Sequence, residues 1–384
     1  MFNIILLGLV SLFTDISSEM VYPLLPLYLT NRLGAGPAVL GVIEGIAESL
    51  ASLLKVGAGY ITDKTKKPKM FTIFGYASSS LSRIVLYLST SWLWVLGARI
   101  IDRFGKGIRT APRDVLILEN AGEKGRGTAF GLHRALDTLG AVIGITLAYF
   151  LLTGYNGDYL KVFIISLIPA FLGVVCLFFV REKKEARFRS NHLSLKWSAL
   201  DKRLKIFLLI TFIFALGNSS NQFLLLKAQG VGFTADKVIL LYLVYNLVYA
   251  LTSFPAGKLS DKIGRKSFLV GGYIFYGLVY LGFAMVKSSS AVWLLFGIYG
   301  LYTGLTEGVE KALIGDIASL ELRGTAIGLH AALVGLGLLP ASFLAGWLWS
   351  GWGSSAPFYF GSFTGFCAAL ALLISPIYPE ARSR

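Results

Sequence analysis

The chain has 384 residues, of which 55% are hydrophobic and only 15% are charged, a composition that excludes an ordinary soluble globular domain. Its formal net charge is +15 at pH 7, which in a soluble protein would suggest a nucleic-acid partner. Here the basic residues gather in loops between apolar runs, so membrane topology explains the charge and we expect no nucleic-acid binding.

Apolar runs of about 20 residues recur along the whole chain, and each is long enough to cross roughly 30 Å of hydrocarbon as a helix. The connections between them are short, so no sizeable soluble domain fits. We therefore expect an all-α integral membrane protein. The predicted transmembrane helices cover residues 4–30, 37–60, 69–88, 92–118, 127–152, 159–180, 204–229, 236–259, 267–286, 291–315, 325–350 and 357–377.

The first run, 4–30, carries Asp15 and Glu19 one helical turn apart and has no small-residue cleavage site after it. We therefore expect a retained helix and no removed signal peptide. The second run, 37–60, carries Glu44 and Glu48, which are also one turn apart.

The fourth run, 92–118, is the most highly charged. Positions 99, 103, 106, 110 and 113 share one helical face, so most of its basic residues form a stripe that cannot face lipid. We expect this stripe to face a wet cavity or acidic groups on neighbouring helices. The charged residues of the run are Arg99, Asp102, Arg103, Lys106, Arg109, Arg113 and Asp114.

The strongest hydrophilic break follows the sixth run. It predicts a cytoplasmic linker over 184–203 between two six-helix bundles, 1–183 and 204–384. Lysine and arginine cluster in this linker, in the loop after the second run and in the loop after the eighth run. If both termini are cytoplasmic, all three clusters lie on the cytoplasmic side, as expected for a multi-pass protein of the inner membrane. The two cysteines show neither metal-ligand nor disulfide spacing.

Three short segments occur twice in the same order, which indicates that the bundles are copies of one ancestral unit. GYITDKTKK follows the second run and GKLSDKIGRK follows the eighth. RGTAFGLH begins at Arg126 and RGTAIGLH begins at Arg323. DISSE lies in the first run at Asp15, and GNSSN lies in the seventh at Gly217.

The first of these repeats resembles the signature G-x-x-x-D-R-x-G-R-R/K of the major facilitator superfamily. The second copy fits with Lys262 in place of an arginine, whereas the first copy has Lys64 for arginine and Lys66 for glycine. The resemblance implies two pseudo-twofold-related six-helix bundles and a cytoplasmic gate; the alternative is a solvated basic loop with no conformational role. The gate candidates are Gly59, Asp63, Lys64, Lys67, Asp114, Gly257, Asp261, Lys262, Arg265 and Lys266.

The context of Arg99, VLGARIIDRFGKG, resembles the fourth helix of the drug–proton antiporter branch of the superfamily. We hypothesise that Asp15 and Glu19 take up and release a proton and that Arg99 or Arg103, together with Asp102, modulates their protonation. The alternative is a static buried ion-pair network that fixes helix packing.

In the superfamily, helices one, four, seven and ten line a central cavity, and the polarity of the corresponding runs agrees with this. Glu307 and Lys311 are four residues apart and are also placed to pair with each other. The substrate-cavity candidates are Glu48, Lys106, Asn218, Asn221, Gln222, Tyr245, Asn246, Tyr302, Thr306 and Glu307.

The resemblance implies a secondary active transporter that acts by alternating access. We expect proton coupling to a small organic solute, with efflux favoured over uptake, energy from the proton gradient, no cofactor, a lipid environment and a monomeric chain. One alternative is transport of an organic anion bound by cations of run 92–118. A non-transporting receptor or scaffold is a further alternative, whereas nothing in the sequence has the spacing of an enzyme's catalytic residues.

Overall fold

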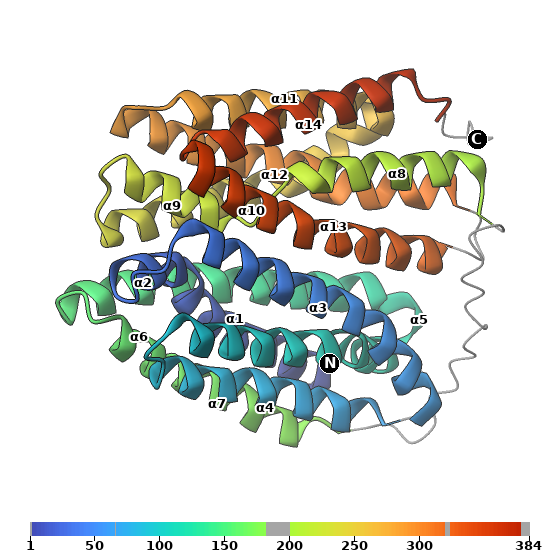
Figure 1. Ribbon diagram of the computed structural model, residues 1–384. Helices are drawn as coiled ribbons and strands as arrows, with labels where there is room; N and C mark the ends of the chain where they lie inside the picture. The colour runs from blue at the N-terminus through green and yellow to red at the C-terminus, as the bar shows by residue number, and fades with distance from the viewer. Residues whose placement is uncertain (1, 66, 182–199, 319–322, 378–384) are drawn as a thin grey trace. The chain divides into compact units, whose positions relative to one another are not determined.

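The computed structural model describes residues 2–65, 67–181, 200–318 and 323–377, which contain helices and no β-strand. Packing divides the chain into two compact units (Figure 1). The first takes in residues within 1–191 and 234–243, and the second takes in residues within 192–233 and 244–384. We call them unit 1 and unit 2. Of the predicted linker 184–203, only residues 200–203 are described.

Unit 1 is built around α1 (Phe2–Val21), which packs mainly on α5 (Trp92–Gly154) and α7 (Leu167–Phe179). The short 3₁₀ helix η1 (Tyr22–Leu24) and α2 (Leu25–Asn31) continue α1. Two further helices, α3 (Pro37–Thr65) and α4 (Pro68–Tyr87), also pack on α5, and α6 (Tyr159–Ile165) precedes α7.

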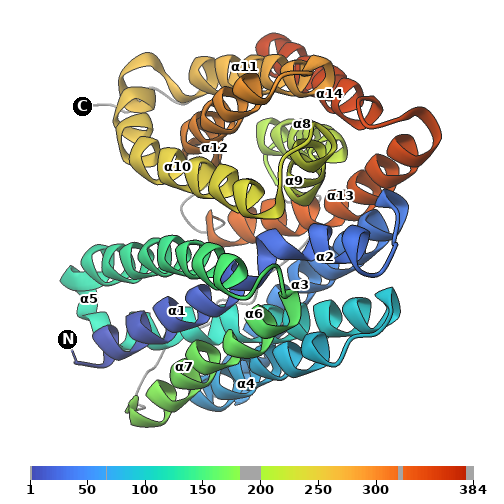
Figure 2. The same cartoon turned by 90° about the vertical axis from the view of Figure 1, so that its left-hand side faces the viewer.

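Unit 2 has α8 (Lys202–Gly217) at its centre, packed on α13 (Arg323–Trp352) and α14 (Ala356–Ile374). Figure 2 shows α8 enclosed by these helices together with α11 (Arg265–Met285) and α12 (Ser289–Ile317). The remaining helices are α9 (Gln222–Gly230) and α10 (Ala235–Ile263), of which unit 2 contains the part from Val244 onward.

Nine helical segments in the described part of the chain are long and apolar enough to cross a membrane. Three predicted spans fall outside this set: α4, the first part of α5 and α12. Each is helical as predicted but carries several polar or charged side chains that lower its hydropathy. Because neighbouring helices can satisfy such groups within a bundle, the polarity of these spans points to buried contacts.

Two predicted spans are interrupted where the local chemistry opposes a straight α-helix. Run 4–30 passes through η1, which has a proline at its start and another just after it, at Pro26. Run 204–229 is broken between α8 and α9 at residues 218–221, which read Asn-Ser-Ser-Asn. Side chains of this kind compete with the backbone for hydrogen bonds and disfavour helix. Figure 1 shows α8 and α9 following one another across this break.

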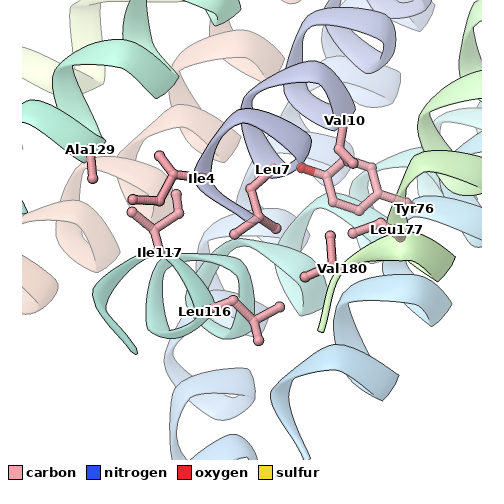
Figure 3. Close-up of a cluster of buried hydrophobic side chains, with 9 residues drawn as sticks. All are labelled: Ile4, Leu7, Val10, Tyr76, Leu116, Ile117, Ala129, Leu177 and Val180. Atoms are coloured by element: carbon pink, nitrogen blue, oxygen red, sulfur yellow. The ribbon is translucent and has the colours of Figure 1, made fainter. Parts of the chain in front are cut away.

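The fourth and fifth predicted spans belong to one helical element, α5, of 63 residues. A straight helix of this length would measure about 95 Å, far more than a bilayer needs. Instead, both limbs return to the same buried cluster, where Ile117 of the first limb and Ala129 of the second lie near Ile4 of α1 (Figure 3). The helix therefore folds back between the limbs, and each limb fills the place of one predicted span.

Close helix packing repeats at matching positions in the two units when the RGTA segments are aligned. Gly75 of α4 faces Arg109, and the matching Gly272 of α11 faces Thr306, which occupies the position of Arg109. Gly107 of α5 packs on α3, and the matching Gly304 of α12 packs on α10. A side chain at any of these glycines would collide with its neighbour, so the internal repeat is structural as well as sequential.

Candidate functional site

A network of buried ion pairs joins α3 to the first limb of α5 in unit 1. Arg99 Nη2 lies 2.7 Å from Glu44 Oε1, and Arg99 Nε donates a hydrogen bond of 2.9 Å to the same oxygen. The side chains of both residues are at most 4% exposed. A pair this deeply buried is held by charge and by a hydrogen bond, and loss of either partner removes the nearest counter-charge of the other.

The network continues one turn further along both helices. Arg103 Nη2 lies 2.8 Å from Glu48 Oε1, which is also 3.8 Å from Arg99 Nη2. Asp102 Oδ2 lies 3.6 Å from Arg99 and 3.9 Å from Arg103. The prediction that acidic groups on neighbouring helices meet the basic stripe is therefore confirmed for Arg99 and Arg103.

The network has two further arginines, of which Arg109 was singled out by the sequence and Arg83 was not. Arg83 of α4 lies 3.4 Å from Asp102 and donates hydrogen bonds to Ser17 and Ser18 of α1. Arg109 donates to Ser79 of α4, and its guanidinium carbon lies 4.4 Å from the centre of the Tyr76 ring. An arginine inside an apolar run is itself a signal of such a role, because it needs a partner at bilayer depth.

The two acidic residues of α1 face the second limb of α5. Asp15 lies within hydrogen-bonding reach of Asp137, which accepts a hydrogen bond from Ser11. One turn along α1, Glu19 Oε2 is buried and has no hydrogen-bond partner among the described residues. Close packing permits this arrangement, since Gly140 and Gly144 of α5 lie directly against the backbone of α1. The sequence gave no reason to expect Asp137 beside Asp15.

Unit 2 contains a cavity of about 230 Å³ between α8, α10, α12 and α13. Its wall includes Asn218 and Asn221, which flank the break between α8 and α9. Breaks of this kind in membrane helices are tolerated where the freed backbone lines a cavity. No lysine or arginine of the described chain lines the cavity. The remaining lining residues are Thr211, Phe214, Ala215, Tyr245, Tyr299, Tyr302, Thr303, Thr306, Glu307, Glu310, Val334 and Leu338.

Stacked tyrosines form one side of the cavity. The rings of Tyr245 and Tyr299 lie 5.2 Å apart between centres at an angle of 23°, and those of Tyr299 and Tyr302 lie 5.6 Å apart. Tyr299 Oη donates a 2.8 Å hydrogen bond to Asn221 Oδ1. This bond ties the aromatic wall to the helix break and fixes the ring faces that a solute would meet.

The two carboxylates of the cavity have different partners. Glu307 pairs with Lys311 at 3.1 Å, as their spacing predicted, and accepts a hydrogen bond from Tyr249. Glu310 instead accepts a 2.9 Å hydrogen bond from Tyr273 of α11 and has its other oxygen 3.6 Å from Nε2 of His330 on α13.

Only some of the predicted substrate-cavity residues line the cavity of unit 2. Asn218, Asn221, Tyr245, Tyr302, Thr306 and Glu307 line the cavity. Glu48 lies in the unit 1 network, and Lys106 is exposed on α5. Gln222 is fully buried away from the cavity wall, and Asn246 of α10 is partly buried and does not line it either.

The repeated motif of unit 2 spans the end of α10 and the start of α11, and its basic residues contact the ends of neighbouring helices. Arg265 lies 2.8 Å from Asp261 and 2.5 Å from Asp316 at the end of α12, and Lys266 donates to the carbonyls of Leu373 and Ser375. The other gate candidates of unit 2, Gly257 and Lys262, are not closely packed: no atom lies within 4 Å of where a side chain on Gly257 would begin, and Lys262 is exposed.

The corresponding motif of unit 1 can be compared only in part. The surroundings of Gly59 and of the Asp63 side chain lie outside what the structure describes, while Lys64 and Lys67 are exposed. Asp114, the expected partner of this copy, pairs with its neighbour Arg113 at 2.9 Å. A gating role for either copy remains a prediction.

The family model of the major facilitator superfamily matches residues 7–225 and 207–384, which together span nearly the whole chain. The chain belongs to the major facilitator superfamily. It is also 41% identical over 377 residues to an uncharacterised MFS-type transporter of Methanocaldococcus jannaschii, covering 97% of this chain and 94% of that protein. The protein is therefore a multi-pass membrane transporter of the MFS type and no enzyme.

More distant relatives and solved structures agree with the fold of this superfamily member. A homologue of the multi-drug resistance efflux pump PmrA from Lactococcus lactis is 25% identical over 80% of this chain and 78% of its own length. The crystal structure of the nucleoside transporter NupG aligns with a TM-score of 0.81 at 15% identity, over 97% of this chain and 98% of that one. A D-xylose–proton symporter aligns with a TM-score of 0.78 at 17% identity, over 100% and 99%.

Proposed function

We propose that this superfamily member is a proton-coupled secondary transporter that binds a small organic solute in the cavity of unit 2 and moves it by alternating access. The observation that carries the proposal is the cavity itself, with its aromatic wall, two amides and two carboxylates at a helix break. Solute sites in membrane transporters are commonly formed at such discontinuous helices.

Proton coupling is supported by the acidic groups of α1. Two carboxyl groups within hydrogen-bonding reach of each other, as Asp15 and Asp137 are, need a proton between them to form that bond. The orphan oxygen of Glu19 would also gain a partner on protonation or on contact with water. Asp15 and Glu19 thus form the proposed proton site, with Asp137 added to it by the structure.

The paired state of the basic stripe favours a neutral or cationic solute over the organic anion considered from sequence. Arg99 and Arg103 are engaged by Glu44 and Glu48. Lys227 of α9 donates to Ser354 and Ser355 and does not line the cavity. An anion would meet two carboxylates in the unit 2 cavity and no lysine or arginine of its described lining.

Efflux is the proposed direction, since relatives of this chain include a multi-drug resistance efflux pump homologue and the multidrug resistance protein MdtH. We further propose that the chain works as a monomer in the cytoplasmic membrane, with both termini on the cytoplasmic side. No cofactor is proposed, and the proton gradient supplies the energy.

The test combines a ligand-stabilisation screen with flux in proteoliposomes. Compounds that raise the melting temperature of the purified protein are candidate solutes, and their flux is then followed under an imposed pH gradient. We expect proton-driven flux in the wild type and its loss in Asp15→Asn and Glu19→Gln, with downhill exchange retained. Thr138→Ala, a change at a partly buried position of α5 next to Asp137, is the control. Gradient-driven flux at the wild-type rate in both acidic variants would contradict the proton role.

A further inference from the structure

Unit 2 holds a second group of buried ionisable side chains, and this one is in direct contact with the cavity. Glu310 lines the cavity from α12, and its side chain is 15% exposed. His330, on α13, is 8% exposed at its side chain and stacks on Phe207 of α8, with the rings 9° from parallel. Tyr273 on α11 is fully buried. Three helices therefore bring a carboxyl, an imidazole and a phenol together beside the cavity.

The hydrogen bonding of this group leaves one contact open, between Glu310 and His330. Tyr273 donates to Glu310 Oε1, which leaves Oε2 facing His330 Nε2 at 3.6 Å. His330 Nε2 is buried and has no hydrogen-bond partner within the described residues. A buried nitrogen of this kind normally finds a partner. One proton placed between Nε2 and Oε2 would supply it, whether it belongs formally to the acid or to the imidazole.

The corresponding positions of unit 1 show that the repeat alone does not produce this arrangement. When the RGTA segments are aligned, His330 matches His133 and Glu310 matches Arg113. A histidine beside an arginine cannot share a proton in this way, since the arginine stays charged. The matching pair of unit 2 instead combines an acid with a base next to a cavity.

The cavity that Glu310 faces suits a positively charged organic group. Tyrosine rings attract cations through their faces, and carboxylates attract them directly. Of the two acids, Glu307 is already paired with Lys311. Glu310 therefore supplies the charge that Lys311 does not directly neutralise.

We propose that Tyr273, Glu310 and His330 form a proton site that shares its carboxyl with the cavity, so that a proton and an organic cation exclude one another there. Binding of the cation releases the proton to water through the cavity, and departure of the cation allows it to return. The neighbouring ionisable groups are Tyr302, Glu307 and Lys311 on α12, with Tyr249 of α10 acting through Glu307; the described contacts of α8 with the group are aromatic. The proposal rests on the proposed function for its solute and adds the cation class and a second proton site.

The test measures the affinity of the purified full-length protein for phenyltrimethylammonium by calorimetry across a pH series. This probe carries a permanent charge, so any pH dependence belongs to the protein. Because proton and cation binding are reciprocally linked, we expect the wild-type Kd to rise roughly tenfold for each pH unit of acidification once the site is protonated. Glu310→Gln should remove this slope, and His330→Gln should shift the pH at which it begins.

Matched variants separate this claim from the proposed function. His133→Gln changes the corresponding histidine of unit 1 and should leave the slope intact, as should Asp15→Asn. The slope is measured without a membrane gradient, so failed proton-driven flux would refute the coupling proposed for α1 and leave this result standing. A wild-type slope in Glu310→Gln would overturn the proton site, and no probe binding at any pH would overturn the cation assignment.

Infrared difference spectroscopy provides a second readout that does not depend on variant affinity. Addition of the probe at acidic pH should remove a protonated carboxyl band in the wild type. The same band should be missing from Glu310→Gln, whose folding is checked by its melting temperature. Persistence of the probe-sensitive band in that variant would likewise overturn the proposal.

Discussion

Matching positions of the two units carry charged residues in α5 of unit 1 and aromatic or hydroxyl residues in α12 of unit 2. In unit 1, Arg99, Asp102 and Lys106 follow one another along α5, and the first two enter buried ion pairs. The matching positions in α12 are Phe296, Tyr299 and Thr303, of which the last two line the cavity. The same helix arrangement therefore holds buried salt bridges in unit 1 and a cavity beside stacked tyrosines in unit 2.

The packing contacts that both units keep explain how such different interiors fit one fold. Gly107 and Gly304 allow α5 and α12 to approach α3 and α10 closely, whatever the polarity of their neighbours. The difference teaches that helix packing and site chemistry are set by different residues on the same helices. We infer that unit 1 contributes charge balance and proton exchange, while unit 2 contributes solute recognition.

The largest expected effect comes from breaking the buried pair that has no counterpart in unit 2. Arg99→Ala removes the direct ion pair of the buried Glu44 carboxylate, which should lower the free energy of unfolding by roughly 3–5 kcal/mol. Thermal unfolding of the purified protein measures it, with Lys106→Ala, an exposed change on the same helix, as control. Arg99→Met combined with Glu44→Leu should recover most of the loss. Equal melting temperatures for Arg99→Ala and Lys106→Ala would contradict a stabilising pair.

A smaller effect should distinguish the matching glycines. In Gly75→Ala the new Cβ would lie 2.6 Å from Arg109 Cβ and 2.7 Å from the carbonyl oxygen of Gly105, so backbone must move. In Gly272→Ala it would meet only the side chain of Thr306, at 2.5 Å from Cγ2. We expect a loss of roughly 1–3 kcal/mol for Gly75→Ala and a smaller loss for Gly272→Ala.

The same unfolding measurement decides the glycine comparison. Gly97→Ala serves as control because nothing lies within 4 Å of its Cβ position, and it should stabilise the helix slightly. A greater loss for Gly272→Ala than for Gly75→Ala would show that the backbone contacts of unit 1 are the more adaptable ones.

The smallest effect is expected within the aromatic wall of unit 2. Tyr299→Phe removes the hydrogen bond to Asn221 but keeps the ring. Affinity for a solute found by the stabilisation screen should weaken by roughly 0.5–1.5 kcal/mol, the usual net value of one hydrogen bond. Calorimetric titration provides the Kd, and Tyr28→Phe, which removes the hydrogen bond of a buried tyrosine in unit 1, gives a contrasting variant. A tighter Kd for Tyr299→Phe would mean that the bond restrains the wall against binding.

Much of the fold follows from hydropathy alone, because a helix that crosses a bilayer must satisfy its own backbone. For the basic stripe, the sequence predicted either a wet cavity or acidic neighbours, and it did not predict that Glu48, a cavity candidate, is one of those neighbours. The break at residues 218–221 lies within GNSSN, which hydropathy alone places inside one continuous helix. Asp137 lies far from Asp15 in sequence, whereas Arg83 and His330 lie on helices next in sequence to those of Asp102 and Glu310. In both cases, spacing along the chain carries no record of which helix faces meet.

The most direct test of the division between the units is solute protection of a single cysteine at matching positions. Cys176 and Cys367 are replaced by serine, and Thr303→Cys in the cavity of unit 2 is compared with Lys106→Cys at the matching position of unit 1. We predict that a solute from the stabilisation screen slows alkylation of the cysteine at 303 and leaves the rate at 106 unchanged. Protection at 106 without protection at 303 would contradict the account.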